Sequence, residues 1–302
     1  MESEEEVAVA DAPRPLRIEW TRLIIIALAA LLAMVLFARL VLHWPDGGKY
    51  ARLGQDHDDL MVADAPNASR TLTIMFVGNS LTSVNDLPAM LIDIASSDPG
   101  VPVRLQAKAF TKGGATLIGI FEDTNALAWA QSHPVDEVVL QEISHWYATE
   151  DAVHASSYGY DATLGSAQRW VDALRPLGAT PVLFQVWADA DDSVAYTDKS
   201  WATFGWTSAR DATESLRSTE RLATRIGTPV APVGEAFDTA SRTPGAPDVW
   251  GPDRHHPSVA GTYLAALVFY RQFTGRTGAE ATWRPNGLSA DDAAKLQRIA
   301  GG

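Results

Sequence analysis

The sequence predicts an α/β domain, a three-layer α/β/α sandwich around a five-stranded parallel sheet. From Thr71 onward, short runs rich in β-branched and apolar residues alternate with stretches of helical periodicity, which is typical of βαβ units. In addition, 46% of the 302 residues are hydrophobic and only 20% are charged. A chain of this composition can bury the core that such a domain needs.

Five strands are expected, each followed by a helix. The strands are TLTIMFV (71–77), VPVRLQAKA (101–109), EVVLQ (137–141), TPVLFQV (180–186) and TPVAPV (228–233). Apolar residues at helical spacing follow in residues 87–95, 115–130, 162–177, 209–226 and 259–274. Because a crossover helix returns the chain to the same edge of the sheet, successive strands are expected to run parallel.

One connection is longer than the others. Residues 187–208 carry five aromatic side chains in a stretch too irregular for a helix. Long loops often carry function, and aromatic rings can stack on sugars or hold acyl groups. Trp187 and Trp201 are therefore candidates for lining a substrate site, with ordinary packing over the sheet edge as the alternative.

The N-terminal part predicts a membrane anchor. Residues 1–22 form a tail with an acidic start, residues 23–42 read LIIIALAALLAMVLFARLVL, and residues 43–70 are polar with scattered Gly and Pro, as in a linker. A helix over the apolar run rises about 30 Å, which matches the hydrocarbon core of a bilayer. We expect one transmembrane helix ahead of a folded domain that spans residues 71–302.

A cleaved signal peptide and a buried core helix are the alternatives for this run. The acidic opening MESEEE and the length of the run favour an uncleaved span. Three basic residues precede the run, and three lie at its end or beyond it, the first of them Arg39 inside the run, so their balance does not orient the span. A lone N-terminal span before a large domain is typical of a signal-anchor, which places the domain outside the cytoplasm.

Composition excludes several function classes. A formal net charge of -13 opposes nucleic-acid binding, which needs clustered Lys and Arg. The chain has no cysteine, which removes thiolate catalysis and cysteine-based metal sites. Walker A, HExxH and G-x-G-x-x-G patterns are missing, so neither a metal nor a cofactor is expected. The acidic residues Asp189, Asp191 and Asp192 lack the spacing of a calcium loop and predict a solvated turn.

Ser80 directly follows the first expected strand, in the run IMFVGNSLT. In open parallel sheets, ligands bind beyond the carboxyl ends of the strands. Gly78 permits a tight turn there, so the Ser80 hydroxyl can be aimed into the crevice, with Asn79 as a candidate substrate contact. The alternative is that Ser80 caps the next helix.

A serine nucleophile needs an imidazole to take its proton, and the imidazole needs an acceptor that fixes its tautomer. His255 and His256 lie in GPDRHHPSVAGTYLAALVFY, and Asp253 stands three residues before His256. One turn with this spacing can present both side chains, so that the Asp253 carboxylate binds one imidazole nitrogen while the other faces Ser80. A helix start preceded by solvated polar residues is the alternative.

Four blocks of sequence resemble the SGNH (GDSL-like) hydrolase superfamily. They are GNSLT, GGATL, a third block reading VVLQE, and D-x-x-H-P-S before the last long helix. The resemblance covers about residues 71–274 and implies an SGNH/flavodoxin-like fold. It also implies that Ser80 is the nucleophile, His256 the general base and then acid, and Asp253 the residue that orients the imidazole. His255 could be the base only in a different loop register.

The resemblance further implies an oxyanion hole with three donors. Two are the Ser80 N–H and a glycine N–H of the second block, for which Gly114 is preferred to Gly113. The third is an asparagine of a G-x-N-D block, which this chain lacks. Gln141 is the nearest amide that could replace it, unless it binds local backbone instead. Weaker candidates in the same loop are Ser144 and His145.

We therefore expect a membrane-anchored serine ester hydrolase that acts on a small-molecule or glycan ester. An O-acetyl or other short acyl ester on a carbohydrate or envelope glycan is the first substrate to test. One alternative is acyl transfer, with a sugar hydroxyl replacing water. The other is a non-catalytic, membrane-tethered glycan-binding or assembly module, which the missing asparagine motivates.

Overall fold

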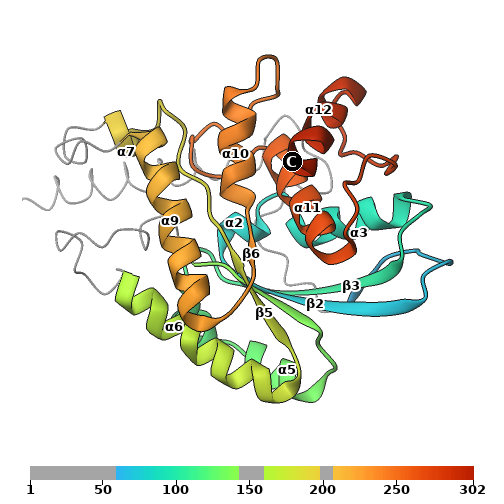
Figure 1. The fold of residues 1–302 in the computed structure, drawn as a ribbon, viewed down its shortest axis with the longest axis vertical. Coiled ribbons are helices and arrows are strands. Elements are labelled where there is room, and N and C mark those ends of the chain that lie inside the picture. The colour runs from blue at the N-terminus through green and yellow to red at the C-terminus, as the bar shows by residue number, and fades with distance from the viewer. Residues whose placement is uncertain (1–58, 143–159, 198–206) are drawn as a thin grey trace, which may run out of the picture. The chain divides into compact units, whose positions relative to one another are not determined.

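The computed structural model describes residues 59–142, 160–197 and 207–302 (Figure 1). The expected tail, the expected transmembrane helix and the first part of the linker precede this region and lie outside the described residues. The same holds for Trp201, Ser144 and His145. In the part of the chain that the structure describes, no helix combines the length and apolar character needed to cross a membrane.

The sheet has six strands in the order β1-β3-β2-β4-β5-β6. Their bounds are β1 Met61–Val62, β2 Arg70–Gly78, β3 Val103–Thr111, β4 Glu137–Leu140, β5 Thr180–Phe184 and β6 Val230–Ala231. The last five run parallel, as expected, whereas β1 pairs antiparallel with β3 at the edge. The five expected strands are all present and parallel, but the sheet has a sixth strand and is mixed, so the prediction of a purely parallel, five-stranded sheet is corrected at this edge. The additional strand comes from the end of the expected linker and is too short for its alternation to be recognised.

The helices follow the strands as expected and continue beyond the predicted set. Their bounds are α2 Ser80–Ser83, α3 Leu87–Ser97, α4 Leu117–Asp123, α5 Ala126–Ser132, α6 Tyr160–Leu174, α7 Val194–Thr197, α9 Ser208–Ile226, α10 Val233–Arg242, α11 Val259–Thr274 and α12 Ala290–Gly301, with a 3-10 turn at Arg175–Leu177. One predicted helix, 115–130, is two. Thr124 ends α4, because its hydroxyl donates to the carbonyl of Ile120 and accepts from the N–H of Ala126.

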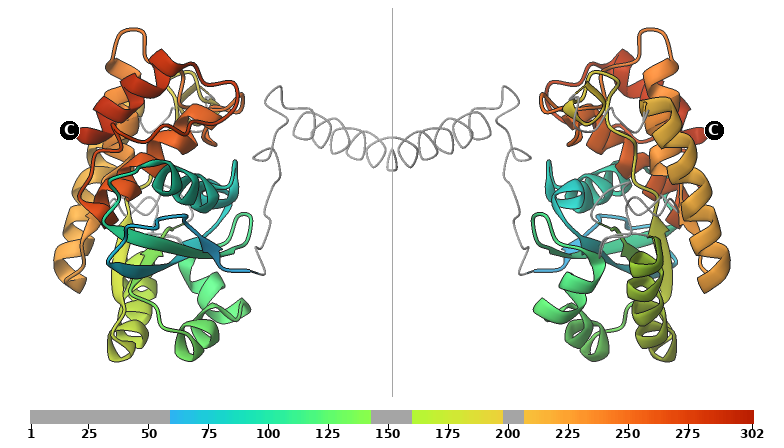
Figure 2. Two further views of the ribbon diagram at one scale, coloured as in Figure 1. Left: turned by 90° about the vertical axis from the view of Figure 1, so that its right-hand side faces the viewer. Right: turned by 90° about the vertical axis from the view of Figure 1, so that its left-hand side faces the viewer.

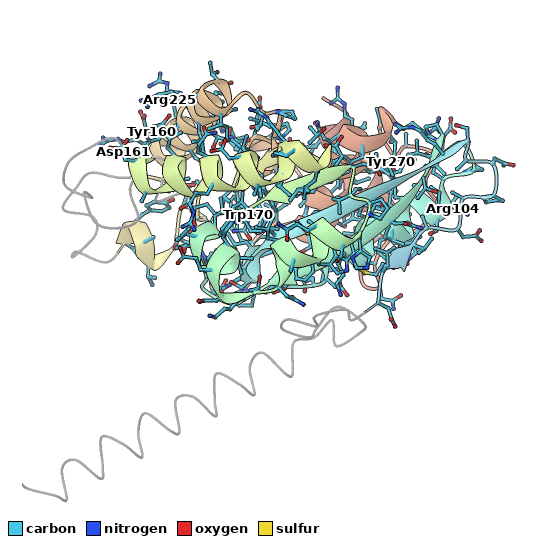
Figure 3. All side chains as sticks on the ribbon, turned by 90° about the horizontal axis from the view of Figure 1, so that it is seen from below. Arg104, Tyr160, Asp161, Trp170, Arg225 and Tyr270 are labelled. Atoms are coloured by element: carbon cyan, nitrogen blue, oxygen red, sulfur yellow. The ribbon has the colours of Figure 1, made fainter. Side chains whose placement is uncertain are left out.

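Helices cover both faces of the sheet (Figures 1 and 2). An apolar core lies on each of these faces. Successive strand residues alternate between them, so that Ile74 and Phe76 face α3 and α11 while Met75 and Val77 face the layer of α4, α5 and α6. Because both faces are covered, the second half of β2 reads as an unbroken apolar run, from Ile74 to Val77. In the second layer, the buried Trp170 of α6 donates from Nε1 to the carbonyl of Leu117, 3.0 Å away (Figure 3).

The chain changes direction across β2. From β3 on one side of β2 it crosses to β4 on the other side, so a crevice is expected at the carboxyl ends of β2 and β4. Gly78 ends β2 at this point, and a Cβ atom there would lie 2.5 Å from Oε1 of Gln141. Only glycine lets the two chain segments approach this closely.

Candidate active site

Ser80 is the first residue of α2 and is half-buried at the carboxyl end of β2. The capping role that was the alternative for Ser80 belongs to Asn79, whose Oδ1 accepts from the N–H of Leu81 at 3.1 Å. The backbone N–H of Ser80 is the first amide of the helix. Amides in the first turn of a helix have no partner within the helix.

Asn79 also ties the neighbouring loops to this turn. Its Nδ2 donates to the carbonyl of Ala115 at 3.0 Å and to that of Glu142 at 3.5 Å. Only 1% of Asn79 is exposed. The expectation that Asn79 contacts a substrate is therefore not met, since its polar atoms are engaged in holding the GGATL loop and the end of β4.

The structure brings Ser80, His256 and Asp253 together. His256 Nε2 lies 2.9 Å from the Ser80 Oγ, and its Nδ1 lies 2.6 Å from Oδ2 of Asp253. The other carboxylate oxygen accepts the backbone N–H groups of His255 and His256. Burial acts to raise the pKa of Asp253, but the hydrogen bond and charge of His256 outweigh burial and hold that pKa well below its usual range.

The loop that carries Asp253 and His256 is a closed turn. The N–H of Gly251 donates to the carbonyl of His256 at 2.7 Å, and the N–H of Arg254 donates to that of Gly251 at 2.9 Å. Arg254 has a φ of 60°, in the left-handed region that costs a non-glycine residue about 1–3 kcal/mol. Its guanidinium group binds Asp192 and Asp248, each at 2.6 Å.

A second histidine–aspartate pair stands beside the first. Nδ1 of His255 lies 2.7 Å from Oδ1 of Asp189, whose side chain is 7% exposed. The rings of His255 and His256 meet edge to face, with centroids 4.9 Å apart. Asp189 lies in the segment after β5. Because its side chain is buried, the prediction that it lies in a solvated turn is wrong. The sequence offered no signal for the pair, because its members lie 66 residues apart on separate loops.

Trp187 is not positioned to contact a substrate. It is 2% exposed and stacks on Phe237 with ring centroids 4.2 Å apart, which is the packing alternative. Its Nε1 donates to the carbonyl of His255 at 3.0 Å. Trp187 thus supports the loop of His256 from the core.

Gln141 is fully buried and directs its oxygen toward the turn of Ser80. Oε1 accepts from the N–H of Asn79 at 2.8 Å and from the hydroxyl of Thr82 at 3.0 Å, and Nε2 donates to the carbonyl of Glu142. If the Gln141 amide were flipped, its NH₂ group would face the N–H of Asn79, and two donors would meet. The hydrogen-bond network therefore fixes the orientation of this amide. The predicted role as an oxyanion donor does not fit these contacts, because the amide binds local backbone.

The two glycines of the second block are both exposed, and a Cβ atom at either would meet no heavy atom within 4 Å. They differ in backbone conformation. Gly114 has a φ of 68°, whereas Gly113 has no positive φ. The turn after β3 therefore requires glycine at position 114.

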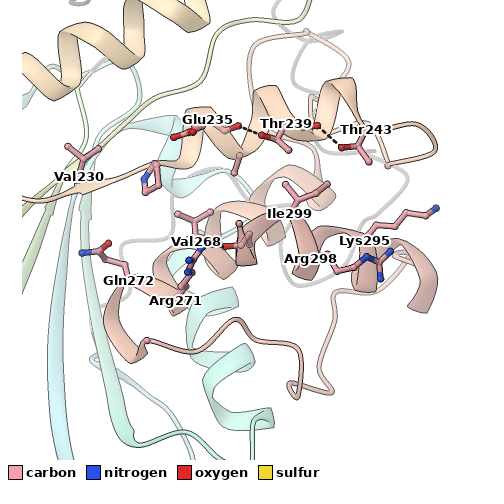
Figure 4. A pocket seen from close by; sticks show the side chains of 15 residues that line it. Val230, Glu235, Thr239, Thr243, Val268, Arg271, Gln272, Lys295, Arg298 and Ile299 are labelled. Carbon is pink, nitrogen blue, oxygen red and sulfur yellow. Dashed lines mark hydrogen bonds between the residues drawn. The ribbon is translucent and has the colours of Figure 1, made fainter.

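A cavity of about 860 Å³ lies elsewhere, between α10, α11 and α12 (Figure 4). Basic side chains from α11 and α12 line it, among them Arg271, Lys295 and Arg298, with Glu235 of α10. None of Ser80, Asp253 and His256 is among its lining residues. The chemistry expected from the sequence is therefore not located in this cavity.

No protein-family model and no curated protein matches the chain. Among solved structures, a protein from Slackia heliotrinireducens assigned as an SGNH hydrolase is 25% identical, with a TM-score of 0.54 over 68% of this chain and 100% of that one. A DUF4886 family protein from Bacteroides uniformis is 17% identical, with a TM-score of 0.61 over 76% of this chain and 93% of that one.

A lipase/acylhydrolase from Enterococcus faecalis has 16% identity and a TM-score of 0.50, and the match covers 68% of this chain and 97% of that one. At identities of 16–17%, the proteins from Bacteroides uniformis and Enterococcus faecalis show only that the fold is shared. These likenesses confirm the resemblance inferred from the sequence blocks, and the described domain has the fold of the SGNH, or GDSL-like, hydrolase superfamily.

Proposed function

We propose that this protein is a serine ester hydrolase in which Ser80, His256 and Asp253 act as a catalytic triad. The observation that carries the proposal is the continuous chain of hydrogen bonds from the Ser80 hydroxyl through the His256 ring to the Asp253 carboxylate. Its geometry has the nucleophile, base and orienting group in contact, as acyl transfer requires. The likeness to a protein assigned as an SGNH hydrolase supports the same chemistry.

In the first step, the Ser80 Oγ bonds to the acyl carbon while its proton passes to Nε2 of His256. The carbonyl oxygen becomes an oxyanion, for which the N–H groups of Ser80 and Gly114 are the proposed donors. Asp253 stabilises the imidazolium, since its low pKa keeps it ionised. His256 then protonates the leaving alcohol, and an acyl-enzyme remains. Water, deprotonated by His256, releases the acid and regenerates Ser80.

An acetyl or other short acyl ester on a carbohydrate is the proposed substrate class. Transfer of the acyl group to a sugar hydroxyl is the related alternative, because the same acyl-enzyme serves both reactions. Product analysis in the presence of a free sugar separates them. Hydrolysis gives free acid at the rate of ester loss, whereas transfer gives an acylated sugar and less acid.

A fluorophosphonate probe tests the nucleophile directly. Wild-type protein is expected to label in a single position, Ser80, and to lose both labelling and esterase turnover in Ser80→Ala. Ser83→Ala is the matched control, because Ser83 lies on the same short helix and is also half-buried. A natively folded wild type that fails to label would favour the non-catalytic glycan-binding module instead.

Attachment to a membrane through residues 23–42 belongs to the same proposal, with the domain outside the cytoplasm. The apolar run in the sequence supports it. Resistance to carbonate extraction would demonstrate a span, and digestion of the domain by external protease in intact cells or spheroplasts would establish the side. Release of the protein by carbonate would contradict the anchor.

A further inference from the structure

One ring nitrogen of His255, Nδ1, is hydrogen-bonded to Asp189, and the other, Nε2, can bind a ligand. Nδ1 faces Asp189, which is held in place by a hydrogen bond from Ser193 Oγ to its second carboxylate oxygen at 3.1 Å. A carboxylate accepts hydrogen bonds, so the neutral ring carries its proton on Nδ1 and leaves a lone pair on Nε2. Within the ranges that the structure describes, no protein group is hydrogen-bonded to that Nε2.

The free edge of the ring is accessible. One-third of the His255 side chain is exposed, and the Nδ1 edge is turned toward the buried Asp189. Nε2, on the other side of the ring from Nδ1, is therefore directed away from Asp189. The pair thus presents a fixed hydrogen-bond acceptor to whatever lies in front of it.

This acceptor stands beside the reacting groups. The His255 ring contacts the ring of His256, whose Nε2 binds the Ser80 hydroxyl. In the proposed reaction the same His256 nitrogen delivers a proton to the leaving alcohol oxygen, so that oxygen comes next to the His256 ring, which the His255 ring adjoins. On the alcohol part, one carbon carries the ester oxygen. A hydroxyl on the carbon next to it is then the group best placed to reach His255.

We propose that Nε2 of His255 accepts a hydrogen bond from a hydroxyl adjacent to the ester on the alcohol part of the substrate. The site therefore selects partially acylated polyols, sugars among them, over esters of simple alcohols. This inference rests on the proposed esterase function and names the substrate class of the same site. Asp189 is a positioning residue, because it acts only through the tautomer and orientation of His255.

Three small acetates isolate the hydroxyl. Full-length protein is assayed for kcat/KM with trans-2-hydroxycyclohexyl acetate, trans-2-methoxycyclohexyl acetate and cyclohexyl acetate. The first can donate to Nε2, the second cannot, and the third lacks the oxygen. A net hydrogen bond of ordinary strength predicts that the wild type prefers the hydroxy ester over both others by about three- to tenfold.

His255→Phe keeps an aromatic ring against His256 and removes the acceptor. It is expected to lose the preference for the hydroxy ester, so that its kcat/KM for trans-2-hydroxycyclohexyl acetate falls about three- to tenfold relative to its own kcat/KM for cyclohexyl acetate. His133→Phe is the matched control, because His133 lies at the exposed end of α5 and bonds only to its own helix and neighbouring residue. It should retain the preference.

Two results would overturn the inference without touching the esterase function. One is equal wild-type turnover of the hydroxy and methoxy esters, which needs no variant and is unaffected if His255→Phe misfolds. The other is an equal fall of all three activities in folded His255→Phe, which would make His255 a support for the loop and not a substrate contact. Failure of the esterase function looks different, because wild type would then hydrolyse none of the three and would not label with fluorophosphonate.

Discussion

The side-chain oxygen of Gln141 accepts a hydrogen bond from the backbone N–H of Asn79, so the end of β4 holds the turn that presents Ser80. The same oxygen accepts from the Thr82 hydroxyl. Both donors belong to buried residues, so the loss of this acceptor would leave two buried polar groups without a partner. Gln141 is in this arrangement a support for the nucleophile, and its contribution can be separated from direct catalysis.

Gln141→Leu should destabilise the fold by about 1–3 kcal/mol, because it leaves the Asn79 and Thr82 donors buried without an acceptor. For a domain of this size, each kcal/mol lowers Tm by about 2–4 °C, which calorimetry resolves. Activity should fall together with stability. An unchanged Tm with kcat reduced about a hundred- to a thousandfold would instead identify Gln141 as an oxyanion donor after all.

Gly78→Ala should disturb the same turn from the other side. The new Cβ would lie 2.5 Å from Gln141 Oε1 and 2.7 Å from Thr82 Oγ1, and both partners are fully buried. Overpacking of this kind costs about 1–3 kcal/mol, so we expect a lower unfolding midpoint in urea and slower fluorophosphonate labelling. Gly113→Ala is the control, since it meets no atom within 4 Å and should match wild type.

The low pKa of Asp253 predicts a pH dependence of stability. A carboxyl group whose pKa is lower in the folded state stabilises the fold above its unfolded pKa of about 3.9, and that contribution is lost as pH falls toward the folded pKa. Wild type should therefore exceed Asp253→Asn in free energy of unfolding at pH 6, and the difference should shrink below about pH 4. Urea titrations at several pH values measure it. A difference that is constant from pH 6 to pH 3 would contradict the assignment.

Two substitutions of Arg254 separate the effect of its strained backbone from that of its ion pairs. Arg254→Ala and Arg254→Gly both lose the pairs with Asp192 and Asp248, but only glycine adopts the φ of 60° without strain. The glycine variant should therefore be more stable than the alanine variant, by about 1 kcal/mol in chemical denaturation. Both should have lower kcat, because the loop that carries His256 is less firmly held. Equal stability of the two variants would show that the turn relaxes without cost.

Much of the site follows from local sequence. The apolar run before Gly78 identifies β2 and places Ser80 at its end, and the pattern after Pro257 predicts α11 with the bounds observed. Asp253 and His256 are brought together by a single short loop. Such features depend on neighbours along the chain, which a sequence displays.

The remainder depends on contacts between distant segments. The orientation of the Gln141 amide is fixed by the Asn79 N–H, 62 residues earlier, and Asp189 looks solvated until His255 is set against it. Strand β1 consists of two residues and is recognisable only through its pairing with β3. None of these relationships leaves a periodic or compositional trace.

The His256 loop docks on the segment after β5. The distance between Ser80 and His256 therefore depends on the spacing of the strands in the sheet. Ser80 directly follows the end of β2, whereas the loop is bound through Trp187 and Asp189 to the segment after β5. Between them lies β4, four residues long and buried over its last three. Adjacent strands are spaced about 4.8 Å apart, so β4 acts as a spacer with a set width. Its core residues therefore fix the distance between the turn that carries Ser80 and the segment on which the His256 loop rests.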